Sequence, residues 1–313
     1  MRTIPLGASG QAVSALCLGT MRFGSATDEA TSVALLDRYV EAGGTFLDTA
    51  NIYARWEPGC RGGESEALLG RWMRQRRNRR RLVLASKVGF EYPGVERGLR
   101  ARQIEEECQK SLGRLGVETM DLYYAHVDDR ATPLEETLEA FNRLVAAGKV
   151  RFIGASNFAA WRLAEARSVS RAAGWAAYAC IQQRYTYLRP KPGATFGAQV
   201  AANADLLDYC KASGTTLLAY SPLLRGAYTR TGRALPTQYV GPDSDARIAA
   251  LKAVAGAHGA TPNQVVLAWM LASDPPVIPV FAASTMDQIN EDLGALDLAL
   301  TAEEMDRLNK ASA

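Results

Sequence analysis

Several features that mark other protein classes are scarce in this sequence. Only two of the 313 residues are histidine, and the five cysteines are widely spaced with no Cys-x-x-Cys pair, so neither a metal site nor a disulfide framework is expected. No apolar run approaches the roughly 18 residues that a membrane span requires. The N-terminal segment has one arginine and an interrupted apolar stretch, which makes it a poor signal peptide. These absences favour a cytoplasmic protein with reduced thiols.

The sequence also lacks an excess of charge and the usual nucleotide-binding motifs. It contains 36 Lys and Arg against 33 Asp and Glu, and the net charge of +3 is too small to draw the whole molecule to nucleic acid or to an anionic membrane. Neither Gly-x-Gly-x-x-Gly nor a P-loop motif is present, which argues against a doubly wound nucleotide-binding sheet. The apolar fraction of 48% is ordinary for a globular protein and excludes a disordered chain.

Short apolar segments rich in β-forming residues alternate with longer segments of helical periodicity. Most of the apolar segments are continuous, which is typical of parallel strands covered by helices. Eight such units predict an α/β fold of the (β/α)8 TIM barrel class, as a single domain over residues 1–313. The expected strands are Ala15–Gly19, Thr45–Thr49, Leu82–Lys87, Met120–His126, Arg151–Ala155, Ala179–Gln183, Thr216–Tyr220 and Val277–Phe281.

Capping signals and turn residues mark the ends of other elements. Thr132–Glu135 predicts a Thr cap followed by Pro at the first helical position, and Thr261–Gln264 repeats this pattern. Thr301–Glu304 predicts a C-terminal extra helix beyond the eighth strand. Ahead of the barrel, Thr3–Leu6 and Gln11–Val13 flank a glycine-containing turn and predict an N-terminal β-hairpin.

Polar residues at the C-terminal ends of barrel strands are candidates for catalysis, because active sites of TIM barrels are built there. Asp48 ends the second expected strand and Tyr53 follows shortly after; Lys87 ends the third strand and His126 the fourth. Each alone has an ordinary structural explanation, such as a cap or a solvated strand end. Together, at matching positions, they indicate a site. The two longest connections follow the sixth and seventh strands and therefore lie at the same face: Tyr187–Ala198 and Leu223–Asp243.

These four residue types suit proton transfer to a developing alkoxide. We expect a buried ion pair with Asp48 to keep Lys87 charged, and this cation to lower the pKa of Tyr53. The phenol would then donate a proton to a carbonyl oxygen near neutral pH and take it back in the reverse direction. His126 would hydrogen-bond to the same oxygen. Because none of these groups reduces a carbonyl, the site requires a hydride donor such as a nicotinamide.

The sequence resembles the aldo-keto reductase superfamily over nearly its whole length. The resemblance implies a barrel that binds NADP(H) without a Rossmann domain. It also implies a catalytic tetrad of Asp48, Tyr53, Lys87 and His126, with Tyr53 as the acid. The motifs that carry it are Leu18–Met21, Gly44–Ala50 with Tyr53, Ser86–Val88, Ser111–Gly116, Asp121–Tyr123, Ile153–Asn157 and Tyr220–Leu223.

The resemblance further implies a cofactor site along the mouth of the barrel. Ser156, Asn157 and Gln182 would hold the carboxamide, and Tyr220 would stack on the nicotinamide ring. Gln182 is preferred to its neighbour because the family pattern is Gln-x-x-Tyr. The other expected cofactor-binding residues are Gly19, Thr20, Met21, Asp48, Ser221, Pro222, Leu223, Arg225, Ala282, Ser284, Gln288, Glu291 and Asp292.

One segment departs from the family pattern. After the eighth strand the family usually offers Lys or Arg to the 2′-phosphate of NADP, but Val280–Asp292 contains neither. Hydrogen bonds from a charged donor to phosphate are stronger than those from a neutral donor. Because this segment offers no charged donor, we expect the enzyme to use NADP with only a weak preference over NAD, and NAD is the alternative cofactor. The residues available in place of the missing cation are Ser284, Thr285 and Gln288 as neutral donors, and Arg225 and Arg230 from the preceding connection.

The substrate is less well defined than the reaction. We expect a small-molecule carbonyl compound, because aromatic side chains near the strand ends would form a pocket wall that suits sugars, aromatic aldehydes and ketones alike. The oligomeric state is open. The expected wall residues are Phe23, Trp56, Tyr92, Tyr187 and Tyr228.

Two other functions stay open at this point. The tetrad also occurs in potassium-channel β subunits, so a cofactor-binding regulatory subunit is one alternative. The arginine-rich run Arg71–Arg81 would suit RNA, but it precedes the third strand and so falls at the face opposite the site. A solvated helix end, where cations complement the helix dipole, explains that run, and we expect no nucleic-acid or membrane partner.

Overall fold

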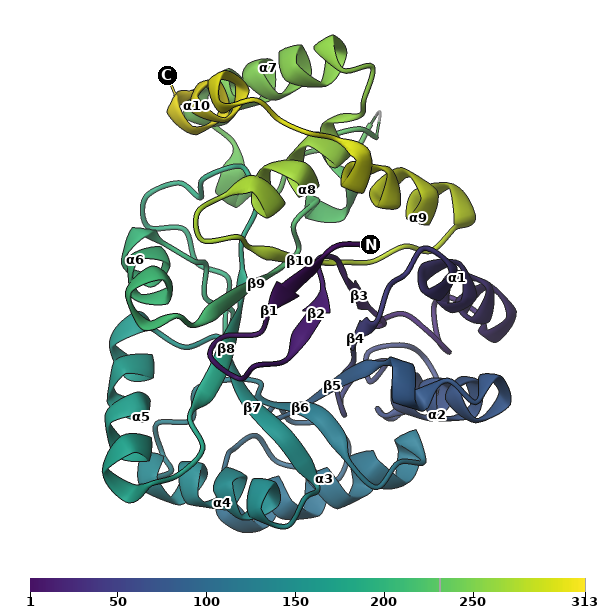
Figure 1. Cartoon of the computed structure of the whole chain (residues 1–313), viewed down its shortest axis with the longest axis vertical. Helices are drawn as coiled ribbons and strands as arrows, with labels where there is room; N and C mark the ends of the chain where they lie inside the picture. Colours follow the sequence, from purple (N-terminus) through teal and green to yellow (C-terminus); the bar gives the residue numbers. More distant parts are fainter. Residues whose placement is uncertain (231, 313) are drawn as a thin grey trace.

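The computed structural model describes residues 1–230 and 232–312, and its centre is a closed barrel of eight parallel strands (Figure 1). The predicted (β/α)8 TIM barrel is therefore confirmed, and each barrel strand overlaps one of the expected strands. In chain order the barrel strands are β3 (Cys17–Gly19), β4 (Phe46–Asp48), β5 (Val83–Val88), β6 (Met120–Ala125), β7 (Val150–Ser156), β8 (Tyr178–Arg184), β9 (Thr216–Tyr220) and β10 (Ile278–Phe281).

Helices surround the barrel, and the C-terminal α10 packs against α7 beyond α8 (Figure 1). The helices are α1 (Glu29–Glu41), α2 (Glu64–Arg76), α3 (Ala101–Leu115), α4 (Leu134–Ala146), α5 (Ala160–Ala173), α6 (Ala204–Ser213), α7 (Pro242–Ala257), α8 (Pro262–Ala272), α9 (Met286–Leu293) and α10 (Ala302–Lys310). Short 3-10 helices are η1 (Arg79–Arg81), η2 (Leu224–Gly226), η3 (Thr237–Tyr239) and η4 (Gly294–Asp297).

The predicted N-terminal hairpin covers the bottom of the barrel. It pairs β1 (Thr3–Pro5) with β2 (Ala12–Ser14), and Figure 1 looks onto it over the barrel opening. Thr216, at the start of β9, accepts a hydrogen bond from Gly7 N at 2.7 Å. A Cβ on Gly7 would lie 2.2 Å from the Ala179 carbonyl oxygen, so only glycine fits this approach. The hairpin closes the N-terminal end, which leaves the C-terminal end as the mouth of the barrel.

The helix caps agree with the sequence except at one position. Thr261 and Thr301 form the predicted capping boxes at the starts of α8 and α10. At α4, however, the N-cap is Pro133, and the Thr132 hydroxyl donates to Asp129 Oδ2 at 2.7 Å. The Asp129 carboxylate therefore holds Thr132 in the preceding loop, and this local competitor for the hydroxyl was not visible in the cap motif.

Continuous burial of the strands explains their unbroken apolar pattern. Every residue of β5 and of β6 is buried, because these strands face the barrel interior on one side and helices on the other. All five cysteines are free thiols, as predicted. Burial raises the pKa of Cys108 and of Cys180 to about 12, which keeps both protonated and unreactive near neutral pH.

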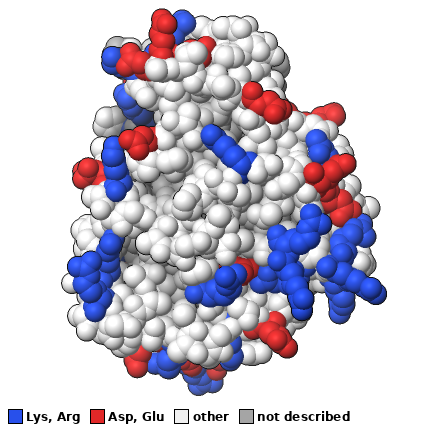
Figure 2. Space-filling view, viewed as in Figure 1, with Lys and Arg blue, Asp and Glu red and all other residues white. Residues whose placement is uncertain are grey.

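The arginine run extends from α2 through η1 to the start of β5. Figure 2 shows the same face as Figure 1, and basic side chains gather on the side where Figure 1 places α2. Much of this charge is balanced locally, which fits a solvated helix end. Three of the arginines form ion pairs with acidic residues of other elements: Arg71 with Glu29 at 2.6 Å, Arg76 with Asp37 at 2.7 Å and Arg79 with Asp121 at 2.8 Å.

Membrane spans and metal sites are two further points on which the sequence led to an expectation. Within residues 1–230 and 232–312, no helix combines the length and the apolar character needed to cross a membrane. In the same residues, no group of three or more His, Cys, Asp and Glu side chains is placed to hold a metal ion.

Candidate active site

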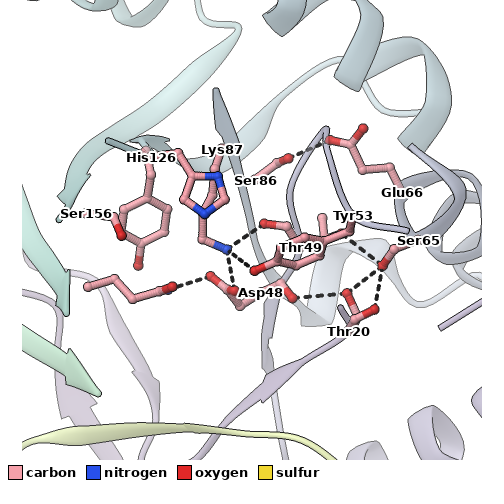
Figure 3. A network of polar contacts seen from close by, with 12 residues as sticks. Thr20, Asp48, Thr49, Tyr53, Ser65, Glu66, Ser86, Lys87, His126 and Ser156 are labelled. Carbon is pink, nitrogen blue, oxygen red and sulfur yellow. Dashed lines mark hydrogen bonds and ion pairs between the residues drawn. The ribbon is translucent and has the colours of Figure 1, made fainter. Parts of the chain in front are cut away.

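The fold brings the four expected catalytic side chains together at the mouth of the barrel (Figure 3). Asp48 is the last residue of β4, Lys87 lies near the end of β5 and His126 directly follows β6. Tyr53 stands in the turn after β4, where its backbone N–H bonds to the Ala50 carbonyl at 3.2 Å. Because neighbouring parallel strands end at the same edge, residues far apart in the sequence meet here.

The Lys87 ammonium is the centre of this cluster. Its Nζ donates to Asp48 Oδ2 at 2.5 Å, to the Thr49 carbonyl at 2.8 Å and to the Tyr53 hydroxyl at 3.0 Å. All three N–H donors of the ammonium are therefore used. The Lys87 and Asp48 side chains are 0% and 1% exposed, so the expected buried ion pair is present.

Burial and charge act in opposite directions on the two proton-carrying groups. Burial alone would lower the pKa of Lys87, but Asp48 and Tyr53 together outweigh it, and the Lys87 pKa is raised. For Tyr53, burial dominates and raises the pKa to about 12, although Lys87 acts to lower it. The expectation of a lowered Tyr53 pKa was therefore wrong, because the sequence showed the cation but not the depth of burial. Near neutral pH the phenol keeps its proton.

His126 is buried beside the Tyr53 ring, with the ring centroids 6.2 Å apart. Burial, and then the charge of Lys87, lower the His126 pKa well below its ordinary value, so the imidazole is neutral. Its Nδ1 has no hydrogen-bond partner among the described residues. Phe90, which the sequence analysis missed, packs edge-on against it at 4.8 Å. The signal was present, since Phe90 is an aromatic residue just beyond a strand end.

The residues expected to hold a carboxamide surround the same ion pair. Gln182 donates from Nε2 to Asp48 Oδ1 at 2.7 Å, which leaves its amide oxygen free to accept. Asn157 is engaged by protein neighbours: its Oδ1 accepts from the Tyr220 hydroxyl at 2.8 Å, and its Nδ2 donates to Ser156 Oγ at 3.1 Å. The bond from Tyr220 joins the ends of β7 and β9. Asn157 therefore helps to fix the positions of these strand ends at the mouth of the barrel.

The alternative glutamine, Gln183, faces away from this cluster. Its Oε1 accepts from the Asn157 backbone N–H at 2.7 Å, and its Nε2 donates to the Phe158 carbonyl at 2.8 Å. Successive residues of a strand point to opposite faces. The pattern-based choice of Gln182 is thus consistent with the direction of its side chain.

A second layer of polar contacts holds the elements that carry these residues (Figure 3). The Ser65 hydroxyl donates to the Thr20 carbonyl at 2.8 Å and accepts from Thr49 Oγ1 at 3.0 Å. Next to it, Glu66 accepts from Ser86 Oγ at 2.5 Å. These buried bonds join the start of α2 to β3, β4 and β5. The sequence analysis missed Ser65 and Glu66, because nothing in their spacing distinguishes them from ordinary helix residues.

Comparison with known proteins identifies the family. A model of the aldo/keto reductase family matches residues 15–313. The chain belongs to this family. It is therefore an NAD(P)H-dependent oxidoreductase of carbonyl compounds.

Individual relatives extend over almost the whole of this aldo-keto reductase. It is 32% identical to the uncharacterized oxidoreductase YrpG of Bacillus subtilis, over 97% of this chain and 94% of that protein. It is also 32% identical to norsolorinic acid reductase stcV of Emericella nidulans, over 95% of this chain and 78% of that protein. The crystal structure of the thermostable aldo-keto reductase Tm1743 in complex with the inhibitor epalrestat matches with a TM-score of 0.79, 31% identity and 100% coverage of both chains.

The region of the aldo-keto reductase after β10 carries acidic rather than basic side chains. Ser284 N donates to Gln288 Oε1 at 2.8 Å, which folds Gln288 back over the start of α9. Asp292 is 3% exposed, and burial followed by the nearby Glu291 raises its pKa to about 8. Arg230 acts in the opposite direction on this pKa, so its guanidinium lies within electrostatic reach of Asp292.

The two candidate arginines differ in position. Arg225 is exposed within η2, with a left-handed φ of 60°. Arg230 is also exposed, and its side chain passes Gly226 so closely that a Cβ there would lie 2.9 Å from Arg230 Nε. The charge of Arg230, unlike that of Arg225, acts on Asp292 of α9. The connection that carries both also contains residue 231, which lies outside the described residues.

The other expected cofactor-binding residues cluster around the mouth. Thr20 is buried, and its hydroxyl donates to the Asp48 carbonyl at 3.0 Å, whereas Met21 is 39% exposed. The rest directly end or follow β3, β9 and β10: Gly19, Ser221, Pro222, Leu223 and Ala282.

The expected aromatic wall is only partly assembled. Trp56 is 47% exposed and packs edge-on against Tyr53 at 6.3 Å. Tyr92 is half-buried, with its hydroxyl on Glu107 Oε2 at 2.5 Å, and Phe23 is fully buried. Trp56 therefore offers an exposed apolar surface beside Tyr53.

Like Phe23, two more of the expected wall residues lie in the core. Tyr187 is 1% exposed, and its hydroxyl donates to the Leu308 carbonyl of α10 at 3.0 Å. The Tyr228 hydroxyl lies 2.7 Å from Thr186 Oγ1, and its ring is 6% exposed. Packing of Tyr187 against α10 and of Tyr228 against Thr186 explains this correction, because a position in a long connection did not reveal which side chains turn inward.

Proposed function

We propose that the enzyme interconverts an aldehyde, ketone or sugar and its alcohol with NADP(H), with Tyr53 as the general acid and base. One observation carries the proposal. A single buried ammonium, Lys87 Nζ, contacts both the Asp48 carboxylate at 2.5 Å and the Tyr53 hydroxyl at 3.0 Å. This arrangement supports a proton donor whose conjugate base is stabilised where it forms.

The residues around the cluster fit a nicotinamide. His126 Nδ1 is buried without a partner, the Gln182 amide oxygen is free to accept, and Tyr220 lies at the end of β9 with its hydroxyl fixed on Asn157. A carboxamide has both a donor and an acceptor for such groups. When bound, the nicotinamide would supply the hydride.

The protein's own contribution is positioning and proton transfer. Tyr53 is protonated near neutral pH, because its pKa is about 12, and it would donate this proton to the carbonyl oxygen. Lys87 would stabilise the resulting phenolate, and Asp48 keeps Lys87 charged. The neutral imidazole of His126 would donate a second hydrogen bond to the same oxygen and orient the carbonyl.

A substrate panel tests this function. Purified protein would be mixed with NADPH or NADH and a set of aldehydes, ketones and sugars, and loss of reduced-cofactor absorbance would be followed. We expect turnover of at least one carbonyl class. A protein that bound NADPH tightly but turned over no member of a broad panel would instead support the regulatory alternative.

The acidic surroundings of α9 lead to a prediction about cofactor choice. A 2′-phosphate carries close to two negative charges near neutral pH, and a neutral hydrogen bond contributes only about 0.5–1.5 kcal/mol, against about 1.5–3 kcal/mol for a charged one. We therefore expect NADPH to be preferred over NADH by only about tenfold, since about 1.4 kcal/mol is a factor of ten. The ratio of kcat/KM for the two cofactors measures it.

Three variants identify the source of any preference. Arg230→Ala is expected to reduce the preference more than Arg225→Ala, because Arg230 is the arginine within reach of Asp292. Ser284→Arg should tighten NADPH and leave NADH nearly unchanged, since only NADPH carries the phosphate. A preference above about a thousandfold that survived both alanine variants would contradict this account, because it would exceed what neutral donors contribute.

Asp292→Asn is expected to stabilise the protein in a pH-dependent way. The pKa of this carboxyl is raised from 3.8 to about 8, so between these values the folded state holds a proton that the unfolded state releases. The Asp292 carboxyl therefore does not lower the free energy of unfolding below about pH 4. It lowers this free energy increasingly between about pH 4 and pH 8, and by a constant amount above about pH 8. A pKa unit corresponds to about 1.4 kcal/mol, and the surroundings of the charged carboxylate relax in part. We therefore expect Asp292→Asn to raise the free energy of unfolding by about 2–4 kcal/mol above about pH 8.

Urea unfolding of wild type and variant across this pH range measures the difference. Asp287→Asn is the matched control, because Asp287 lies on the same helix but is exposed. Equal effects of the two substitutions, or a gain for Asp292→Asn that did not change with pH, would show that burial of Asp292 is not the cause.

A further inference from the structure

Arg184 is the last residue of β8 and points into the mouth of the barrel. Side chains alternate along a strand, so Arg184 shares the inward face of Gln182, whose amide contacts Asp48. Two residues of strand place it about 7 Å further along β8. Its cross-strand neighbour on β9 is Tyr220. Arg184 thus stands above the Asp48–Lys87 pair on the open side of the site.

The Arg184 guanidinium has no polar partner among the described residues. Within residues 1–230 and 232–312, its Nε and Nη1 are buried without a hydrogen-bond acceptor. Its contacts are aromatic: the guanidinium lies 4.6 Å from the centre of the Phe196 ring, and its charge lowers the pKa of Tyr220 and of Tyr239 against the larger effect of burial.

Three other cations of the fold have acceptors, and Arg55, whose Nε also lacks one, still pairs with Glu91 through its Nη2 at 3.2 Å. Lys87 is paired with Asp48, Arg114 donates to Glu66 Oε2 at 2.6 Å, and Arg247 donates to the Tyr187 carbonyl at 3.0 Å. Leaving buried donors of a charged group without an acceptor is costly. The Arg184 guanidinium is therefore placed to bind an acceptor that comes from outside the chain.

We infer that Arg184 binds a carboxylate of the substrate, and that the enzyme prefers aldehydes or ketones that carry one. This inference rests on the proposed function, which places the carbonyl at Tyr53. A planar guanidinium matches a carboxylate through paired N–H bonds. The separation along β8 suits a carboxylate that is joined to the carbonyl by a short chain or an aromatic ring. The Phe196 and Tyr239 rings beside the guanidinium provide apolar contact for that spacer.

The cofactor pyrophosphate is the other anion that a cation at this mouth might meet. The position of Arg184 favours the substrate, since its neighbours Gln182 and Tyr220 belong to the proposed nicotinamide end. The phosphates are expected instead beside the residues after β9 and near α9. Measurement of cofactor affinity in the same variants separates the two sources.

The test compares 4-carboxybenzaldehyde with its neutral methyl ester. For wild type we expect kcat/KM for the acid to exceed that for the ester by about 10- to 100-fold, as a charge-assisted bond would give, mainly through KM. In Arg184→Met this ratio should fall to near one, and in Arg184→Lys it should be partly restored. Arg102→Met, an exposed arginine on α3, is the matched control and should keep the wild-type ratio.

Two further readouts make each outcome decisive. NADPH affinity, measured by fluorescence titration, should stay within about threefold of wild type in Arg184→Met, because a lost phosphate contact would cost more. A wild-type ratio near one overturns the inference, and so does a variant in which weakened NADPH binding accompanies equal losses for both aldehydes. If wild type reduced neither aldehyde, the broad carbonyl panel would decide the proposed function separately. Calorimetric binding of 4-(hydroxymethyl)benzoate would then decide the role of Arg184. Binding that is lost in Arg184→Met would support the inference, and binding that is unchanged would overturn it.

Discussion

Replacing Tyr53 by phenylalanine is expected to lower turnover by about 10²–10⁴-fold, the usual contribution of a positioned general acid. The substitution removes the hydroxyl that accepts from Lys87 Nζ at 3.0 Å and keeps the ring that packs against Trp56 and His126. The reacting oxygen would then lack its proton donor, while the shape of the site is unchanged. Single-turnover and steady-state rates on a good substrate measure the loss.

Cofactor affinity and thermal unfolding should change little in this variant. Lys87 still has two of its three acceptors, the Asp48 carboxylate and the Thr49 carbonyl. Tyr178→Phe is the matched control, since the Tyr178 hydroxyl is buried and has no partner in the described part of the chain, and its ring packs against Phe158 on the outer side of the barrel. Wild-type turnover in Tyr53→Phe would show that another group donates the proton.

The pH profile provides a second test of the same residue. With a pKa of about 12, Tyr53 is in its acid form throughout the neutral range, so carbonyl reduction should not decline between pH 6 and 9 through loss of that proton. A lowered pKa, as the sequence suggested, would make reduction fall within this range. The direction of the pKa shift therefore has a measurable consequence.

The barrel could be predicted because the sequence pattern of each strand is set by the burial of that strand alone. Strands such as β5 and β6 are buried on both faces, so their apolar segments are continuous and can be recognised one at a time. Capping boxes such as that of Thr261 depend on four consecutive residues and were also predicted correctly. The Thr132 cap was wrong because Asp129, outside the motif, holds the same hydroxyl.

The site was predictable only as a set of residue types at strand ends. The sequence placed Asp48, Tyr53, Lys87 and His126 at one face, since strand ends in a barrel converge. It did not show that Gln182 contacts Asp48 across 134 positions of chain, or that Tyr187 turns into the core. Nor did it show that Arg184 lacks a partner, because partners are set by tertiary contacts rather than by spacing.

Lys87→Met is expected to abolish most activity and to destabilise the fold, by about 3–5 kcal/mol, because it leaves a buried carboxylate without its cation. Asp48 would keep only the Gln182 amide as a side-chain donor. The Tyr53 hydroxyl would lose the neighbour that acts to lower its pKa, so the phenolate formed after proton donation would be unsupported. Urea unfolding and turnover, measured on the same preparation, report the two effects.

A double variant separates the structural role of the ammonium from its catalytic role. Asp48→Asn combined with Lys87→Met removes both buried charges, so most of the lost stability should return, since replacing a buried ion pair by neutral groups is often close to neutral. Activity should not return, because no cation would remain beside Tyr53 to stabilise the phenolate. A stable double variant with restored turnover would contradict the proposed role of Lys87. If Lys87→Met alone were as stable as wild type, the carboxylate of Asp48 would have to be satisfied by groups other than Lys87.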